Sequence, residues 1–349
     1  MGASGGRRAR RHVVSLLTLA ATLGAPSALR SDPRAPPRAV KVLVIASTGA
    51  ESQGWLDELT LSDAVAVPGL SPAYPDVRCN ADDVCLLTTG PGKANAAASV
   101  TAVVHSPDFD LSQAYFLLAG LARIDPSQGT IGSVAWARRA VDYGTAWEID
   151  ARTLPAGWST GYLGIGTTAP TEKPVFMFGS EVFALGSELA DKAFALSGSV
   201  TLDDSDAARA YRANYPDDAA TAAPRVIQCD TATSDTVWHG ALLGARARDW
   251  VTLLTDGEGL YCTAQQTDNA SIAALARGGE AGLLDVGRIA VLRAAWHFDR
   301  QYPGQTAYDS FGADAGGLPL ALRNLVLAGA PVIAEIVGNW SAWRVGVPP

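Results

Sequence analysis

The chain has 349 residues, of which 48% are hydrophobic and 18% charged, a composition typical of a folded globular protein rather than a disordered one. The formal net charge of −8 argues against nucleic acid or an anionic membrane surface as a partner. Only four histidines occur, and neither a CxxC pair nor an HExxH motif is present. We therefore expect no metal site and no cofactor.

The first residues have the pattern of a secretory leader. A basic cluster, Arg7–Arg11, precedes an apolar run, Val13–Leu23, and Ala25–Ala28 supplies the small residues of a cleavage site. The run is too short to cross a bilayer, which takes roughly 20 residues. The paired arginines leave twin-arginine export open as the route. We expect export to the periplasm or the medium, with three parts to the chain: a signal peptide over 1–28, a flexible lead-in over 29–39 and a single domain over 40–349.

Apolar runs and helical patterns alternate along the rest of the chain. Buried strands are predicted over Val40–Ala46, Val84–Leu87, Ala114–Gly120, Ile131–Val141, Arg225–Asp230 and Ile289–Ala295. Helices are predicted over Trp55–Leu61, Ala94–Val104, Glu181–Leu196, Ser205–Tyr211, Thr267–Arg277 and Leu318–Leu327. Strands followed by helices, without internal repeats, predict an α/β sheet covered by helices on both faces.

Ligands of such sheets bind at the carboxyl ends of the strands. We expect five segments to gather at that rim, namely Ser47–Glu51, Thr88–Asn95, Gly120–Asp125, Asp230–Asp235 and Trp296–Asp299.

A glycine-rich turn, Thr89-Gly90-Pro91-Gly92, joins a predicted strand to a predicted helix. The backbone N–H groups at such a helix start suit an anion or a ligand hydroxyl. A phosphate loop would need Ser or Thr where Ala94 stands, and a dinucleotide fingerprint would need Gly or Ala where Asn95 stands. A purely structural turn is left open as well, because glycine permits tight backbone geometry.

The four cysteines are an even count in a chain that we expect to be exported. Cys79 and Cys85 flank a turn-rich stretch between two extended segments, so a hairpin would bring them within disulfide range. We predict that these two are bonded. The state of Cys229 and Cys262 is left open.

The glycine turn with its helix, Thr89–Ala97, and the next strand, Tyr115–Gly120, resemble the core of the nucleoside phosphorylase superfamily. More closely, the chain resembles the purine nucleoside permease family. The segments that carry this resemblance run in order across nearly all of the chain after the leader: Glu51 with Trp55, Pro68–Pro72, Phe109–Leu111, Ile124–Pro126, Trp147–Arg152, Trp158–Tyr162, Cys229–Asp230, Tyr261–Thr263, Asp268–Ala270, Val291–Arg293 and Phe298–Arg300.

The resemblance implies a nucleoside-phosphorylase-like mixed central sheet flanked by helices on both faces. It implies an exported protein that binds a purine nucleoside and serves its uptake across a membrane. The alternative is an extracytoplasmic purine nucleoside phosphorylase or hydrolase that cleaves the N-glycosidic bond. Phosphate and membrane transport components are further candidate partners, nucleic acid is not, and an oligomer is left open.

The resemblance and the sheet rim together give a set of candidate nucleoside-binding residues: Gly49, Glu51, Thr89, Gly90, Gly92, Asn95, Gly120, Asp235, Thr267, Asp268, His297 and Asp299. We expect the ribose near Gly90–Asn95 and the base near His297 and Asp299.

Three departures from the pattern of the phosphorylases affect the expected activity. Thr267 stands where a ribose-binding Glu is expected, and Trp296-His297 stands where Ser-Asn or Ser-Asp is expected. Arg123 replaces a glycine, which narrows the pocket or adds an anion contact. Because Thr267 brings no negative charge to stabilise an oxocarbenium-like transition state, we assign no catalytic residue.

Overall fold

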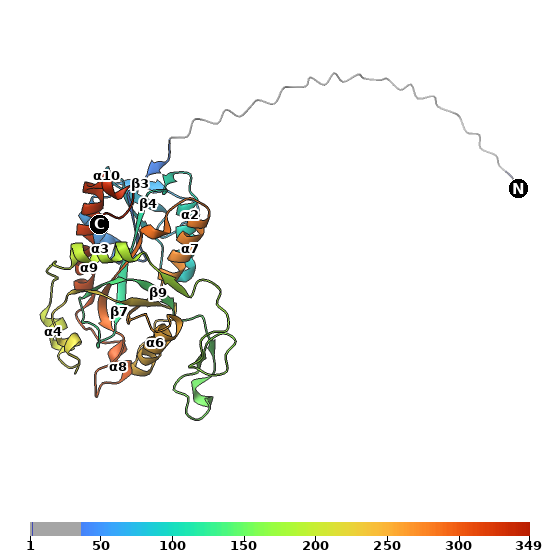
Figure 1. Ribbon diagram of the computed structural model, residues 1–349, viewed down its shortest axis with the longest axis vertical. Coiled ribbons are helices and arrows are strands. Elements are labelled where there is room, and N and C mark those ends of the chain that lie inside the picture. Colours follow the sequence, from blue (N-terminus) through green and yellow to red (C-terminus); the bar gives the residue numbers. More distant parts are fainter. Residues whose placement is uncertain (1, 3–35) are drawn as a thin grey trace, which may run out of the picture. The chain divides into compact units, whose positions relative to one another are not determined.

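The computed structural model describes residue 2 and residues 36–349 (Figure 1). The predicted signal peptide, apart from residue 2, and the first part of the predicted lead-in lie outside the described residues. The lead-in was expected to extend to residue 39, but its last two residues lie in a strand. Arg38–Ala39 forms strand β1, which pairs in parallel with Phe109–Asp110 (β6).

A mixed sheet of twelve strands runs through the described part of residues 37–349. Its main path is β12-β9-β14-β15-β7-β2-β5-β4-β3, and β16 branches from it by pairing with β7 and with β8, which also pairs with β13. These strands are β2 (Val42–Ala46), β3 (Asp63–Ala66), β4 (Asp76–Cys79), β5 (Val84–Thr88), β7 (Tyr115–Ile124), β8 (Val134–Ala137), β9 (Arg139–Asp142), β12 (Val182–Ala184), β13 (Val226–Gln228), β14 (Asp230–Thr233), β15 (Tyr261–Gln265) and β16 (Ile289–Phe298). A separate antiparallel pair joins β10 (Trp147–Glu148) and β11 (Tyr162–Leu163).

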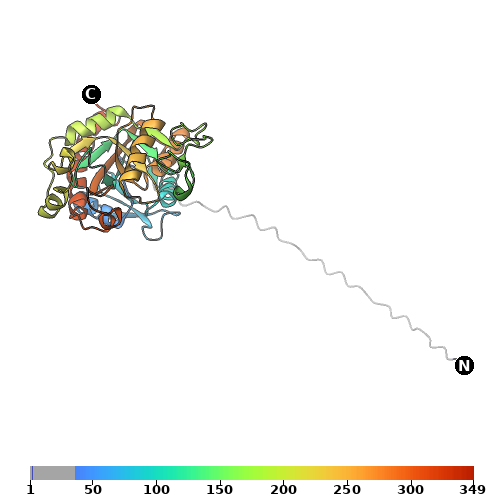
Figure 2. The same cartoon turned by 90° about the horizontal axis from the view of Figure 1, so that it is seen from below.

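The described helices and helical turns cover this sheet. They are α1 (Gly49–Leu59), α2 (Lys93–Val104), η1 (Ala151–Thr153), α3 (Ser187–Ser197), α4 (Asp206–Arg212), α5 (Asp218–Thr221), α6 (Ala241–Leu254), α7 (Asp268–Glu280), η2 (Val286–Arg288), α8 (Ala307–Phe311), α9 (Leu318–Gly338) and α10 (Trp340–Trp343). In Figure 1, α2 and α7 lie side by side at one face of the sheet, and α3 and α9 lie at the other. Figure 2 shows the strands enclosed between helices when the same unit is seen from below.

Strand β2 shows why the central strands read as continuous apolar runs. Its alternate residues Val42 and Val44 belong to the core under α1, α3 and α9, whereas Leu43 and Ile45 belong to the core under α2. Successive side chains of a strand point to opposite faces, so a strand covered on both faces needs apolar residues at every position. The predicted α/β sheet with helices on both faces is confirmed.

Several predicted boundaries differ from the structure. Helix α1 begins at Gly49 rather than near Trp55, because Thr48 and Glu51 form a capping box that starts it early. The predicted helix over 181–196 is divided into a short strand, β12, and α3, since Val182–Ala184 pairs antiparallel with β9. Helix α6 and strand β15 were not predicted at all.

The longest helix, α9, belongs to the core. Among the described residues it is the one helix whose length and composition would allow it to cross a membrane, and 56% of its apolar window is buried within the fold. Its Gly329 lies against Trp55 of α1, and Asn324 donates to the Gly132 carbonyl. These contacts are those of a helix packed inside a folded domain.

All four cysteines are in disulfides. Cys79 and Cys85 are bonded across the β4–β5 hairpin with their Cα atoms 4.1 Å apart, as predicted. Cys229 and Cys262, whose state was left open, are bonded to each other and connect the start of β14 to β15.

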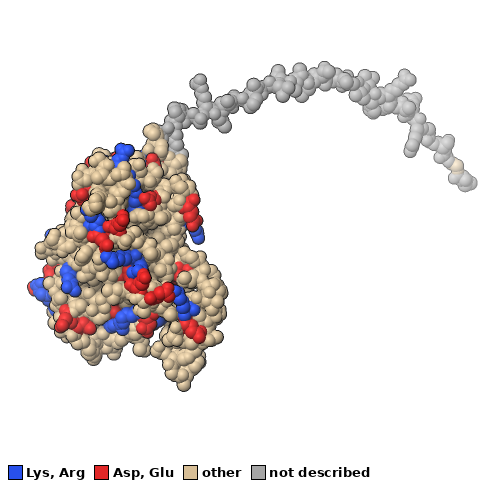
Figure 3. Space-filling view, in the orientation of Figure 1, with Lys and Arg blue, Asp and Glu red and all other residues tan. Residues whose placement is uncertain are grey.

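Charged side chains of both signs are interspersed on the face of residues 36–349 shown in Figure 3, where no broad basic field appears. Several of the charges are paired. One such cluster holds α4, where the Asp204 carboxylate accepts two hydrogen bonds of 2.7 Å from Arg212 and pairs with Arg209 at 3.0 Å.

The Asp204 cluster predicts a pH-dependent contribution to stability. The hydrogen bonds from Arg212 lower the pKa of Asp204 to about 2, against about 3.9 in an unfolded chain. The stabilisation is therefore fully present above about pH 4 and is lost as pH falls towards 2. Because the side chain is 19% exposed, we expect Asp204→Asn to lower the free energy of unfolding by about 1–2 kcal/mol at pH 7.

Urea denaturation at pH 7 and pH 3 measures this difference, which should shrink to about half at pH 3. Asp206→Asn is the matched control, because that carboxylate is 99% exposed and should contribute little. A difference of equal size at both pH values would contradict the prediction.

Candidate functional site

A cavity of about 320 Å³ opens beside the carboxyl end of β2, on β7 and β16. Four of the five segments expected at the rim contribute to its wall, through residues after β2, on β7, after β14 and on β16. The fifth, the glycine turn, does not. The lining residues are Ser47, Thr48, Glu51, Leu121, Ala122, Arg123, Ser234, Thr236, Val237, Trp238, Ala264, Gln265, Gln266, Thr267, Arg293, Trp296 and Leu318.

Glu51 fixes one wall of this cavity. Its Oε2 accepts hydrogen bonds from the backbone and hydroxyl groups of Ser47 and Thr48, at 2.5–3.2 Å. Its Oε1 accepts a 2.6 Å bond from the Leu121 N–H on β7. The side chain is 4% exposed. One carboxylate thus starts α1 and also holds the end of β2 against β7.

A buried ion pair lies next to Glu51. Both carboxylate oxygens of Asp268, the first residue of α7, accept from Arg293 of β16, through Nε at 3.0 Å and through Nη2. Burial raises the pKa of the Asp268 carboxyl, and the Arg293 guanidinium opposes that shift. Gly120 pairs with Arg293 across the strands, and a Cβ there would overlap the guanidinium and lie 2.6 Å from Glu51 Oε1. The glycine is thus what lets the two charged groups lie this close.

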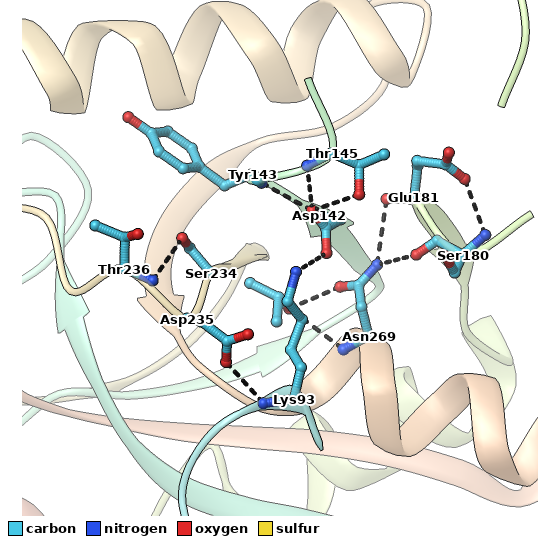
Figure 4. A network of polar contacts seen from close by, with 12 residues as sticks. Lys93, Asp142, Tyr143, Thr145, Ser180, Glu181, Ser234, Asp235, Thr236 and Asn269 are labelled. Carbon is cyan, nitrogen blue, oxygen red and sulfur yellow. Dashed lines mark hydrogen bonds and ion pairs between the residues drawn. The ribbon is translucent and has the colours of Figure 1, made fainter. Parts of the chain in front are cut away.

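The start of α2 is occupied by the chain itself, contrary to the expectation of an open anion site (Figure 4). The Lys93 N–H donates to Asp235 Oδ1 at 2.7 Å, and Lys93 Nζ pairs with Asp142 at 2.9 Å. Asn95 Nδ2 donates to the Pro91 carbonyl, so this amide closes the turn. The helix N-terminus still binds an anion, but that anion is the Asp235 carboxylate from a segment 142 residues away.

The backbone conformation of the turn explains why two of its residues are glycines. Gly90 and Gly92 both have φ of +86°, the left-handed region that favours glycine. Thr89 turns its hydroxyl to the Gly90 carbonyl at 2.8 Å. At the other expected turn, the Gly49 N–H donates to the Tyr74 hydroxyl at 3.0 Å. None of these four residues lines the cavity.

His297 and Asp299 also lie away from the cavity wall. Strand β16 continues to Phe298, so Trp296 and His297 are inside it, and Trp296 is the one that lines the cavity. His297 donates from Nδ1 to the Phe298 carbonyl at 2.9 Å, and burial lowers the pKa of its ring. On this part of β16, Trp296 and not His297 lines the cavity.

Asp299 belongs to a buried ionic network behind the strands. It accepts from the Tyr261 hydroxyl at 2.9 Å and from Arg300 Nε at 2.7 Å, and Arg300 also pairs with Asp125. Burial raises the pKa of Asp299 to about 6, although Arg300 opposes the shift. Its oxygens are engaged inside the fold.

Of the twelve candidate residues, Glu51 and Thr267 line the cavity, and Gly120 and Asp268 contact residues that do. Arg123, Arg293 and Trp296 also line the cavity, although they are not among the twelve candidates. A usable signal was present, because an arginine inside a continuous apolar strand must be buried and needs a partner or a ligand.

The mixed sheet, its two helical layers and a cavity at the strand ends define a nucleoside-phosphorylase-like α/β protein. The fold is similar to a 5'-methylthioadenosine/S-adenosylhomocysteine nucleosidase from Neisseria meningitidis, with a TM-score of 0.51 and 16% identity over 85% of this chain and 99% of that one. It is also similar to the futalosine hydrolase of Helicobacter pylori, with a TM-score of 0.54 and 10% identity over 85% and 98% of the two chains.

Sequence comparison gives the family. The family model "Purine nucleoside permease (NUP)" matches residues 39–348. A purine nucleoside permease of Candida albicans is 36% identical over 306 residues, 86% of this chain and 75% of that protein. A probable purine nucleoside permease of Schizosaccharomyces pombe is 37% identical over 315 residues, 87% and 90% of the two chains. The chain belongs to the purine nucleoside permease family.

The close packing at Gly120 leads to a test of the cavity wall. We expect Gly120→Ala to lower the free energy of unfolding by about 1–3 kcal/mol, because the methyl group displaces Arg293 and Glu51 from their buried positions. Urea denaturation measures the effect. Gly338→Ala in α9 is the matched control, since a Cβ there meets nothing within 4 Å. Equal midpoints for the two variants would show that the wall tolerates a methyl group.

Proposed function

We propose that the chain binds a purine nucleoside in the cavity and serves its transport across a membrane. The observation that carries this proposal is the composition of the cavity wall. It places an aromatic ring, Trp296, and apolar side chains such as Leu121 next to polar groups from Glu51, Gln265 and Thr267. A purine offers a flat apolar ring for the first set, and ribose hydroxyls suit the second.

The wall suggests an orientation that revises the expectation from sequence. The ribose would lie at the Glu51 and Thr267 end, and the base would lie along Trp296. The earlier placement of ribose at the glycine turn loses its basis, because Asp235 already occupies the Lys93 N–H there.

Export and transport are part of the same proposal. The leader pattern supports export, and membership of the permease family supports a part in nucleoside uptake. Since α9 is packed into the core, the proposal assigns the crossing of the bilayer to separate membrane components.

Cleavage of the N-glycosidic bond is the second candidate, favoured by the carboxylate of Glu51 in the cavity wall. That carboxylate accepts five hydrogen bonds, four at Oε2 and one at Oε1, so the fold holds it in place and leaves Oε1 with room for one further donor, such as a ribose hydroxyl. His297 gives its Nδ1–H to a backbone carbonyl and lies off the wall, so it does not offer a proton to a leaving base. We therefore propose binding without cleavage.

Calorimetric titration with guanosine, inosine and adenosine tests the binding site. We expect Trp296→Ala to weaken binding by roughly 5- to 150-fold, because stacking of a base on an aromatic side chain contributes about 1–3 kcal/mol. Trp147→Ala is the control, since Trp147 is 51% exposed on β10 and does not line the cavity. Chromatography of the same mixtures, with and without phosphate, should find no free base.

Either of two results would count against the proposal. Absence of nucleoside binding by the wild type would remove it entirely, and equal affinity for wild type and Trp296→Ala would remove the assigned site. Release of free base would transfer the assignment to the cleavage alternative.

The leader is tested separately. Mass spectrometry of the protein recovered from its native host should show loss of the first ~25–30 residues. Recovery of the intact chain from the cytoplasm would rule out export by this leader.

A further inference from the structure

A second cavity, of about 370 Å³, lies between α6 and the segment 144–181, which connects β9 to β12 (Figure 1). Its lining has no residue in common with that of the first cavity, and its volume is that of a small-molecule site. The α6 wall includes Leu242, Ala245, Asp249 and Leu253, which are three or four residues apart and so lie on one face of the helix. Leu242 is 78% exposed. This helix face is therefore not fully covered by the rest of the fold.

Arg246 of α6 holds the opposite wall of this cavity in place. Its guanidinium carbon lies 3.7 Å from the ring centre of Tyr143, which follows β9, and 3.7 Å from that of Tyr162 on β11. Arg246 is 5% exposed, and its Nη2 donates to the Tyr143 carbonyl at 2.8 Å. The same segment is tied to the end of α6 by an ion pair of 2.7 Å between Lys173 and Asp256. Tyr162 therefore has a fixed position in the cavity wall.

The polar groups at the rim of this cavity are available to a ligand. Asp249 is exposed, and its carboxylate has no hydrogen-bond or ion-pair partner among residues 36–349. Arg246 lies three residues before it on the helix but does not pair with it, because the guanidinium is held between the two tyrosine rings. The hydroxyls of Ser159 and Thr171, on the opposite wall, have no partner in the described part of the chain either. One carboxylate and two hydroxyls are thus free to bond a ligand.

This combination suits a ring that carries neighbouring hydroxyl groups. A carboxylate is an acceptor with two oxygens, and dinucleotide-binding folds use one to bind a ribose hydroxyl. An aromatic side chain such as Tyr162 can pack against the apolar face of the ring. We propose that the second cavity binds a ring with vicinal hydroxyls, the chemistry shared by the ribose of a nucleoside and a free sugar. Asp249 is the residue that recognises the hydroxyls.

Calorimetric titration of the full chain carrying Trp296→Ala, which weakens the first cavity, tests the second. We expect this variant to bind adenosine and to bind 2′-deoxyadenosine roughly tenfold more weakly, because the deoxynucleoside lacks one of the two adjacent hydroxyls and so loses a hydrogen bond to a charged group. Adding Asp249→Asn should weaken adenosine binding by a similar factor, because the carboxylate charge is removed. Adding Asp206→Asn instead is the matched control, since that carboxylate is 99% exposed and lies outside the cavity.

D-Ribose, titrated into the same variants, distinguishes the two sources of the ligand. If D-ribose binds and Asp249→Asn weakens it, a free sugar is sufficient; if only adenosine shows this dependence on Asp249, the ligand is a nucleoside. Either result supports the proposal. Equal affinity for adenosine and 2′-deoxyadenosine, or equal affinity with and without Asp249→Asn, would overturn it. Absence of binding of both adenosine and D-ribose to the Trp296→Ala variant would also overturn it, while nucleoside binding by the wild type would still stand as a property of the first cavity.

Discussion

A sheet that is buried on both faces has to find a partner for every charge that its strands carry, because an isolated charge in an apolar interior is strongly unfavourable. Strands β7 and β16 each carry an arginine into this interior. Arg293 meets its partner, Asp268, at the start of α7. Arg123 has no such carboxylate and is held by aromatic rings and a neutral histidine. The cavity lies next to Arg123, the arginine whose charge no carboxylate balances.

The same constraint explains why the fold could be predicted well from the sequence. Strands covered on both faces are apolar at every position, so β2, β5 and β7 are visible as uninterrupted runs. The hairpin disulfide was also predictable, because only five residues lie between Cys79 and Cys85 and they include a turn. Short strands such as β12 were not, since three residues carry too little pattern and only their pairing with β9 defines them.

The site was harder to predict, because its polar residues satisfy one another across long distances in the sequence. The helix start at Lys93 has the features of an anion site, but its N–H already donates to the Asp235 carboxylate from the loop after β14. His297 was expected to lie after its strand, yet β16 runs three residues further and puts Trp296 on the wall instead. A sequence pattern can identify donors and acceptors, but it cannot show which of them already have partners within the fold.

The hydrogen-bond partners of the acidic side chains near the cavity also bear on the choice between binding and cleavage. A cleaving site would need a carboxylate with free lone pairs and a group that can protonate the departing base. Glu51, the carboxylate of the cavity wall, is held by backbone and hydroxyl donors, and Asp268 behind it is bound by Arg293. Arg123, in the same wall, has a buried Nε without a hydrogen-bond partner, and a guanidinium has no capacity to act as a base. Acids that the fold holds in place, beside an arginine without an anionic partner, are the features on which we base the proposal of binding over cleavage.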